Sequence, residues 1–227
     1  MMTLVIAHRG ASAAHPENTI EAFVAAREMG ADWVELDVRH TGSGDIVVHH
    51  DAVTPNGELI RSQSLADLPD SIPTLEQAIE ACGEMGVNIE IKNDPKDDDF
   101  DPEHLMVPRI VEIARATLAR DKVLVTSFDM GAINAVHDLD RNMPTGFLTM
   151  DDIGVEVSVG RAKAHNHVAV NPSDAITTKR WVDEALANEL DVYVWTVDDP
   201  DRMIELAGMG VAGIITNVPD VAIETLR

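Results

Sequence analysis

Residues 33–50, with the sequence WVELDVRHTGSGDIVVHH, decide how the strands of this chain are arranged. The segments Trp33–His40 and Ile46–His50 are short and contain β-branched residues, which is typical of strands. Only Thr41–Asp45 separates them, and this link is too short for the helical crossover that joins parallel strands. Its Gly-Ser-Gly sequence is typical of a tight turn. We therefore predict that the two segments form an antiparallel hairpin.

The rest of the chain alternates short apolar runs with segments of helical period. Further strands are predicted at Thr3–His8, Val87–Lys92, Val123–Ser127, Thr145–Thr149, His167–Asn171, Val192–Val197 and Gly213–Thr216. Helices are predicted at Thr19–Met29, Leu75–Met85, Glu103–Arg120, Met130–Leu139, Val155–Ala164, Thr178–Asn188, Asp201–Met209 and Asp220–Leu226. Once Ile46–His50 is assigned to the hairpin, eight parallel strands remain. The prediction is an α/β fold, a single (βα)8 TIM barrel domain over residues 1–227 with a short β-hairpin arm after strand two.

Local signals mark several helix ends. Two pairs have the spacing of N-terminal capping boxes, Asn18 with Glu21 and Thr74 with Gln77. Three glycines stand where helices are expected to stop: Gly30, Gly86 and Gly210.

The composition excludes several classes of function. The chain has 227 residues, of which 45% are apolar, and a net charge of −23 from 17 Lys and Arg against 40 Asp and Glu. A field of that sign repels nucleic acid and anionic membranes, so we expect neither as a partner. No stretch approaches the roughly 20 apolar residues of a membrane span, and none resembles a signal peptide. We therefore expect a cytoplasmic protein that is not inserted in a membrane.

Two other features are expected to be structural. Cys82, the sole cysteine, lies in an alanine-rich helical segment and should be a small buried residue. The acidic stretch Asp94–Asp101 has alternating aspartates like the start of a calcium loop. However, Pro102 and Pro108 occupy the positions where an EF-hand has Gly and Glu. We expect this stretch to be a solvated loop.

Polar residues gather where the predicted strands end, which is the functional edge of an α/β barrel. Glu35 and Asp37 are two positions apart and therefore share one face of their strand, as do Glu90 and Lys92. Three carboxylates that meet at the barrel mouth cannot all stay ionised without a compensating charge. Oxygen ligands favour a hard divalent cation, so we predict that Glu35, Asp37 and Glu90 bind Mg²⁺ or Ca²⁺. The alternative is a structural network in which they pair with Arg9 and Lys92.

Two histidines and two cations complete this polar set. His8 and His50 are the candidate acid–base pair, because imidazole titrates near neutral pH. Arg9 and Lys92 are the candidate ligands of a phosphate, which Arg binds through two oxygens and Lys as a point charge. Apart from His49, the remaining histidines are expected to be surface or packing residues: His15, His40, His104, His137, His165 and His167.

The hairpin also predicts which of two adjacent histidines faces the site. A turn centred between Ser43 and Gly44 places Asp37 directly opposite His50, with both side chains on one face. His49 then points the other way. A slip of one residue would instead present His49 to the carboxylates, because register and facing are coupled in a strand.

Nine short motifs resemble the glycerophosphodiester phosphodiesterase family, in order, from residue 6 to about 220. They are HRG (8–10), PENT (16–19), ELDV (35–38), HD (50–51), IPTL (72–75), EIK (90–92), SF (127–128), WTV (195–197) and GIITN (213–217). The resemblance implies a (βα)8 barrel of the phosphatidylinositol phospholipase C-like phosphodiesterase superfamily. It implies metal-dependent hydrolysis of a small glycerophosphodiester to sn-glycerol 3-phosphate and an alcohol.

The resemblance also implies roles for individual residues. The metal ligands are Glu35, Asp37 and Glu90, the catalytic histidines His8 and His50, the phosphate-binding cations Arg9 and Lys92, and the substrate-pocket residues Glu17 and Trp195. Three departures from the family pattern leave these residues untouched. Ser43-Gly44 replaces an Asp-Gly turn, the segment Ala52–Gly57 is short, and Asp198 stands where Asn is common. The short segment bears on which alcohol is released.

Three other functions are open at this stage. A related phospholipase of the C or D type would act on intact lipid and needs an apolar or basic rim, which this acidic chain with few aromatic residues hardly offers. A Schiff-base aldolase could use Lys92, but that chemistry needs a lysine of lowered pKa, and the neighbouring carboxylates act in the opposite direction. A non-catalytic phosphate-binding barrel is disfavoured, because no ligand or histidine of the motifs is missing.

Overall fold

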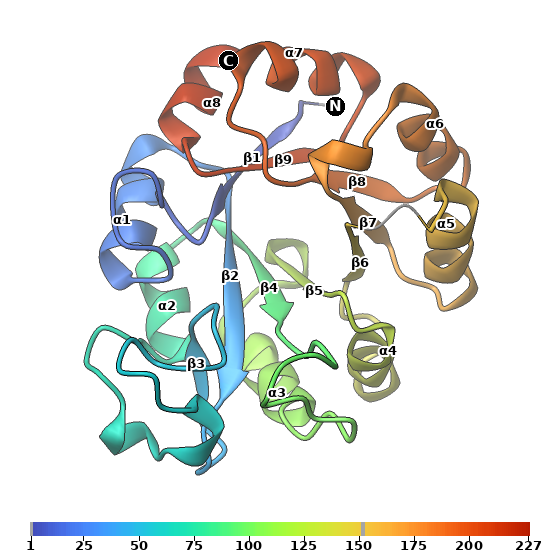
Figure 1. Ribbon diagram of the computed structural model, residues 1–227. Helices are drawn as coiled ribbons and strands as arrows, with labels where there is room; N and C mark the ends of the chain where they lie inside the picture. The colour runs from blue at the N-terminus through green and yellow to red at the C-terminus, as the bar shows by residue number, and fades with distance from the viewer. Residues whose placement is uncertain (1, 151–152) are drawn as a thin grey trace.

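The structure, a computed structural model, describes residues 2–150 and 153–227 and has a closed barrel at its centre (Figure 1). The barrel strands are β1 Leu4–His8, β2 Trp33–His40, β4 Gly86–Ile91, β5 Val123–Ser127, β6 Thr145–Thr149, β7 Ala169–Pro172, β8 Asp191–Val194 and β9 Gly213–Thr216. Neighbouring strands pair in parallel, and the pairing of β1 with both β2 and β9 closes the ring. The predicted (βα)8 TIM barrel is confirmed.

Eight helices of the described residues surround the barrel (Figure 1). They are α1 Ile20–Met29, α2 Leu75–Cys82, α3 Val107–Thr117, α4 Met130–Leu139, α5 Val155–Ala164, α6 Lys179–Ala187, α7 Pro200–Met209 and α8 Pro219–Leu226. Outward-facing strand residues such as Leu36 and Ile91 pack with helix residues in one buried apolar cluster. Cys82 belongs to this cluster, as predicted, and burial raises the pKa of its thiol to about 12. None of the described helices combines the length and the hydropathy needed to cross a bilayer.

The ninth strand, β3 (Ile46–Val48), forms the predicted arm. It pairs antiparallel with β2 and lies outside the ring, on the opposite side of β2 from β4 in Figure 1. The predicted register is wrong by one residue, because Val38 lies opposite Val48 and His40 opposite Ile46. The turn has three residues instead of two. The N–H of Thr41 donates to the carbonyl of Asp45 at 2.9 Å, and Gly44 adopts the left-handed φ of +87° that such loops require.

Most of the predicted helix ends are confirmed. Thr74 and Gln77 form the capping box of α2, and Gly30 and Gly210 end α1 and α7 in the left-handed conformation. Two predictions are wrong. The N-cap of α1 is Thr19 and not Asn18, and α2 ends before Gly83, so that Gly86 opens β4 instead. At Gly86 a Cβ would lie 2.1 Å from the indole of Trp33 in β2, so close packing of the two strands accounts for the glycine.

Gly10 shapes the turn by which the chain leaves β1. Its φ is +84°, and a Cβ added there would lie 2.6 Å from the carbonyl carbon of Ala22 in α1. This close approach lets the backbone after His8 and Arg9 cross directly beneath the first helix. A side chain at position 10 would have to strain the backbone and push α1 away.

We expect Gly10→Ala to lower the free energy of unfolding by about 2–4 kcal/mol, from left-handed strain and overpacking combined. Gly160→Ala in α5 is the matched control, because open space surrounds that glycine. It should be neutral or stabilising by up to about 1 kcal/mol, since Ala favours helix over Gly. Chemical denaturation measures both, and equal effects would contradict the close-packing argument.

Candidate active site

Three buried carboxylates meet at the carboxyl ends of two neighbouring strands. Glu35 and Asp37 come from β2 and share a face, and Asp37 lies directly beside Glu90 in the parallel pairing of β2 with β4. One oxygen of each side chain lies within 4.8 Å of the corresponding oxygens of the other two. All three residues are buried, and Asp37 has no exposed surface. We call Glu35, Asp37 and Glu90 the carboxylate triad.

The carboxylate triad has the electrostatics of a site for a cation. Burial, with the charges of Asp37 and Glu90, raises the pKa of Glu35 well above its usual value. Burial acts in the same direction on Asp37, but Lys92 and Arg9 outweigh it, so the pKa of Asp37 is lowered. Oε1 of Glu35 and Oδ1 of Asp37 are buried without a hydrogen-bond partner among the described residues. Unpaired buried oxygens of this kind fit a hard divalent cation such as Mg²⁺ or Ca²⁺.

Two cations neutralise part of this charge. The Nε atom of Arg9 lies 3.0 Å from Oδ2 of Asp37, and Nη1 lies 2.9 Å from Oε1 of Glu17. The Nζ atom of Lys92 lies 2.7 Å from Oε1 of Glu90 and 3.6 Å from Oδ1 of Asp37. Burial alone would lower the pKa of Lys92, but Glu90 and Asp37 raise it above its usual value. Lys92 is therefore a cation at neutral pH.

His8 is oriented by a chain of hydrogen bonds that reaches Asp198. Nδ1 of His8 lies 2.7 Å from Oδ1 of Asn217, and the Asn217 side-chain N–H₂ donates to Oδ2 of Asp198 at 2.7 Å. Oδ1 of Asn217 also accepts from the Ser12 hydroxyl at 2.9 Å. Because this amide oxygen only accepts, Nδ1 of His8 must carry the proton. The lone pair of Nε2 then faces the carboxylate triad, 3.9 Å from Oε2 of Glu35.

Burial and the charge of Arg9 also lower the pKa of His8 below its usual value. The imidazole is therefore neutral at pH 7, with its unprotonated nitrogen toward the triad. A neutral imidazole in this tautomer can accept a proton in the site.

The hairpin register by which the sequence placed His50 toward the site is wrong, although His50 does line the cavity. Asp37 is opposite His49, whose N–H donates to the Asp37 carbonyl at 3.0 Å, so the two predicted cross-strand partners are not opposed. The slip does not present His49 to the triad. Because β3 ends at Val48, the strict alternation of side chains ends there too, and it is His50 that lines the cavity. Nδ1 of His50 lies 2.7 Å from Oδ1 of Asp51, and the ring of His49 contacts the carbonyl of Val53.

Asn18 is a site residue that the sequence analysis assigned to a helix cap. It is buried, its side-chain N–H₂ donates to Oδ2 of Asp37 at 2.8 Å, and its Oδ1 accepts from the Asp37 N–H at 3.3 Å. The backbone of Asn18 has a left-handed φ of +58°, which Asn tolerates better than most residues. It therefore fixes the orientation of one member of the carboxylate triad. The PENT motif was the only signal of this role in the sequence.

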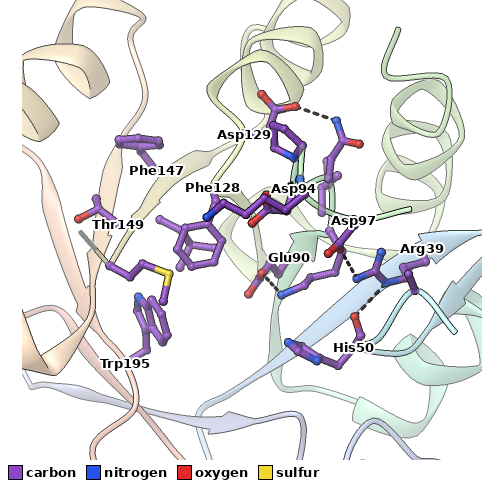
Figure 2. Close-up of a pocket in the computed structure, with 18 of the residues that line it drawn as sticks. Arg39, His50, Glu90, Asp94, Asp97, Phe128, Asp129, Phe147, Thr149 and Trp195 are labelled. Carbon is purple, nitrogen blue, oxygen red and sulfur yellow. Dashed lines mark hydrogen bonds and ion pairs between the residues drawn. The ribbon is translucent and has the colours of Figure 1, made fainter. Parts of the chain in front are cut away.

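His8, Arg9, His50, Glu90 and Lys92 line a cavity of about 600 Å³ at the barrel mouth. Figure 2 shows Phe128, Phe147 and Trp195 on one side of it and charged residues, among them Arg39 and Asp97, on the other. The rings of Phe128 and Trp195 meet edge to face with centroids 5.5 Å apart. Trp195 therefore lines the cavity as predicted, whereas Glu17 is not among the lining residues and contacts Arg9.

The acidic stretch after β4 is not a solvated loop throughout. Asp99 and Asp101 are buried, because Asp99 pairs with Arg39 and Asp101 accepts hydrogen bonds from two backbone N–H groups of its own loop. Asp94 and Asp97 line the cavity, and Asp97 also pairs with Arg39. No local pattern in the sequence indicates these pairs, because Arg39 lies about 60 positions earlier in the chain.

His104, for which the sequence predicted no functional role, contacts a residue that lines the cavity. Its Nε2 lies 2.8 Å from Oδ2 of Asp129, which also accepts from Asn93 at 2.7 Å. Asp129 and Asn93 line the cavity, so His104 supports its rim and is not a simple surface residue.

A model of the glycerophosphoryl diester phosphodiesterase family matches residues 8–221. The chain belongs to this family. A glycerophosphodiester phosphodiesterase of Caldanaerobacter subterraneus is 30% identical and is matched over 100% of this chain and 99% of its own length. The corresponding enzyme of Bacillus altitudinis is 29% identical over 98% of each chain. This confirms the family resemblance that the nine motifs indicated. It also confirms the predicted enzyme class, a phosphoric diester hydrolase.

Two solved structures have the same fold as this protein, a member of the glycerophosphoryl diester phosphodiesterase family. That of Thermotoga maritima glycerophosphodiester phosphodiesterase has a TM-score of 0.84 at 26% identity and covers 100% of this chain and 99% of its own. An Oleispira antarctica phosphodiesterase, solved in complex with the product sn-glycerol 3-phosphate, has a TM-score of 0.89 at 24% identity. The match covers 99% of this chain and 96% of the other.

The hydrogen-bond chain to Asp198 predicts the tautomer of His8. In ¹⁵N NMR spectra at neutral pH, the His8 ring should show a protonated Nδ1 and an unprotonated Nε2. Asp198→Ala leaves the Asn217 amide free to turn, so the tautomers of His8 should become mixed. His137, on the surface of α4, is the internal control and should not change. An Nε2-protonated His8 in the unaltered protein would contradict the assignment.

Proposed function

We propose that this protein hydrolyses glycerophosphodiesters to sn-glycerol 3-phosphate and an alcohol, with the aid of a divalent cation. The observation that carries the proposal is the buried carboxylate triad, which lies beside two cations and two histidines at the mouth of a cavity. Membership of the glycerophosphoryl diester phosphodiesterase family supports the choice of substrate. The product bound to the Oleispira phosphodiesterase also supports it, because a small molecule of that kind fits a cavity of about 600 Å³.

The carboxylate triad is the proposed metal site, for Mg²⁺ or Ca²⁺. When bound there, such an ion supplies positive charge that lowers the pKa of a nearby hydroxyl and stabilises charge on a phosphoryl oxygen. Asn18 holds Asp37 in place, and the parallel pairing of β2 with β4 sets Asp37 beside Glu90. Arg9 and Lys92 are proposed to bind the other phosphoryl oxygens, so that a chain with a charge of −23 still offers a locally positive site.

The two histidines are proposed to move the protons. His8 is neutral with Nε2 free, so it accepts the proton of the glycerol 2-hydroxyl as that oxygen attacks phosphorus. Nδ1 of His50 lies beside the Asp51 carboxylate, which orients the ring, and we assign to His50 the donation of a proton to the departing alkoxide. The product of this step is a cyclic phosphate and the free alcohol. Water then opens the ring with the roles reversed: His50 takes the water proton and His8 returns its proton to the 2-oxygen.

A Schiff-base aldolase is not supported by the surroundings of Lys92. Such an enzyme needs an amine that is uncharged near neutral pH, in a desolvated or cationic setting. Here Glu90 and Asp37 raise the pKa of Lys92. Trapping of a carbonyl substrate on Lys92 with borohydride would reverse this conclusion.

The metal proposal predicts that chelation abolishes release of sn-glycerol 3-phosphate and that Mg²⁺ or Ca²⁺ restores it. Glu35→Gln, Asp37→Asn and Glu90→Gln should mainly raise the cation concentration that gives half-maximal activity. A proton on Glu35 competes with the cation because the pKa of Glu35 is raised, so the required cation concentration should fall as pH rises. Isothermal titration and a coupled assay over a panel of diesters measure these effects.

Fully demetallated protein that keeps its rate would overturn the metal proposal. The same panel should include vesicles of intact phospholipid, which this protein should not hydrolyse. Turnover of vesicles but not of water-soluble diesters would favour a lipid-directed phospholipase instead.

The histidine proposal predicts that His8→Ala and His50→Ala each reduce kcat by about 10²–10⁴-fold, the usual effect of losing a general acid or base. His49→Ala is the matched control, because its ring contacts the carbonyl of Val53 and does not line the cavity. It should change kcat by less than about threefold. Equal losses at positions 49 and 50 would show that the roles are assigned wrongly.

A further inference from the structure

Arg39 is a fully buried cation that the proposed reaction does not use. It is the bulkiest of the fully buried side chains among the described residues and lies on the same face of β2 as Glu35 and Asp37. A guanidinium can be buried at a tolerable free-energy cost only when its donors are paired. The partners of Arg39 therefore indicate what it is for.

Its donors connect two separate segments of the cavity rim (Figure 2). Nη1 donates to both carboxylate oxygens of Asp99 at 2.7 Å, and Nη2 donates to Oδ2 of Asp97 at 2.8 Å. Nε donates to the backbone carbonyl of His50 at 2.8 Å. Arg39, Asp97 and Asp99 thus form a unit, here called the Arg39 clamp, that joins the loop after β4 to His50.

His50 lies just beyond the last residue of the arm that is paired in the sheet. Pairing of β2 with β3 ends at Val48, and the last backbone hydrogen bond of the arm to Asp37 comes from His49. The side chain of His50 is 35% exposed, and its ring contact is with Asp51, which is itself 70% exposed. The hydrogen bond from Arg39 therefore supplies a tie between His50 and β2 that strand pairing does not.

The Arg39 clamp is also rigid at the end that contacts the loop after β4. Asp99 has only 2% of its side chain exposed and accepts two hydrogen bonds from one nitrogen of Arg39. The guanidinium group is planar, so fixing Nη1 and Nη2 on the loop also fixes the direction in which Nε–H points. That direction is the carbonyl of His50.

We propose that Arg39, held by Asp97 and Asp99, is a positioning residue that sets His50 at the distance from the substrate that proton transfer requires. This inference rests on the proposed function, in which His50 gives its proton to the departing alkoxide. A displacement of about 1 Å can cost on the order of 10²-fold in rate, so one backbone hydrogen bond can matter greatly here. Arg39 itself does not contact the reacting atoms.

The test replaces the clamp without leaving a buried charge unpaired. Arg39→Met alone would leave Asp99 ionised in the interior, whereas Arg39→Met with Asp99→Leu replaces the pair by apolar side chains. We expect the double variant to unfold cooperatively, to lose about 10–100-fold in kcat and to keep KM within about threefold. Its half-saturating Mg²⁺ concentration should stay unchanged, because the carboxylate triad and Asn18 are intact. A generally loosened site would change KM and metal affinity as well.

Arg39→Lys is the second variant and serves if the double variant does not fold. It keeps the positive charge, but one ammonium group cannot bind Asp99 and the His50 carbonyl with the same fixed geometry. It should also lower kcat more than it changes KM. If either folded variant keeps kcat within twofold of the unaltered protein, the positioning role is wrong.

Arg61→Gln is the matched control for the loop. Nη1 of Arg61 donates to the backbone carbonyls of Asp99 and Phe100 at 3.1 and 3.0 Å, so it holds the same loop but not His50. We expect a change in kcat below about threefold. A loss as large as that of the clamp variants would assign the effect to loop order and overturn the inference.

His50→Ala, measured in parallel, distinguishes failure of the proposed function from failure of the positioning inference. If His50→Ala keeps full activity, the proposed function of His50 fails. If His50→Ala is inactive while the clamp variants are not, the positioning inference alone fails.

Discussion

Three carboxylates buried within 4.8 Å of one another set the main electrostatic constraint on this protein. Their mutual repulsion and their desolvation both oppose ionisation, which the raised pKa values of Glu35 and Glu90 express. Arg9 and Lys92 offset this repulsion only in part, because they are two cations against three carboxylates and Arg9 also pairs with Glu17. The site is thus built to attract one more positive charge. A divalent cation meets that need, and the same positive charges suit a phosphodiester.

The barrel gives several of the side chains with a proposed function a second, fixed partner. Asn18 holds Asp37, the pair Asn217 and Asp198 holds His8, and Arg39 reaches the backbone of His50. The Asp198 carboxylate accepts hydrogen bonds from both the backbone and the side chain of Asn217, which leaves the amide a single orientation. Asp198 thereby strengthens the orientation of His8.

The hairpin arm and the loop after β4 together form the charged wall of the cavity. The arm and the residues after it contribute Arg39, His50, Asp51 and Ala52 to the cavity lining, and the loop after β4 contributes Asp94, Pro95, Lys96 and Asp97. Phe147 of β6, Phe128 after β5 and Trp195 after β8 form the other wall. A molecule bound in the cavity would therefore meet a charged side and an aromatic side.

The sequence alone determined the strands, the helices and the triad, because these follow from short-range regularities. A period of two places Glu35 with Asp37 and Glu90 with Lys92, and a five-residue link can only be a hairpin. Only the tertiary structure decided the rest. The hairpin register depends on whether the turn takes two or three residues, and both readings of Thr41–Asp45 obey the same local rules. The acidic loop looked solvated because its partner Arg39 is about 60 residues away, and Asn18 looked like a cap because Asp37 is 19 residues away. A hydrogen bond between distant segments exists only once packing has brought them together, so no local pattern records it.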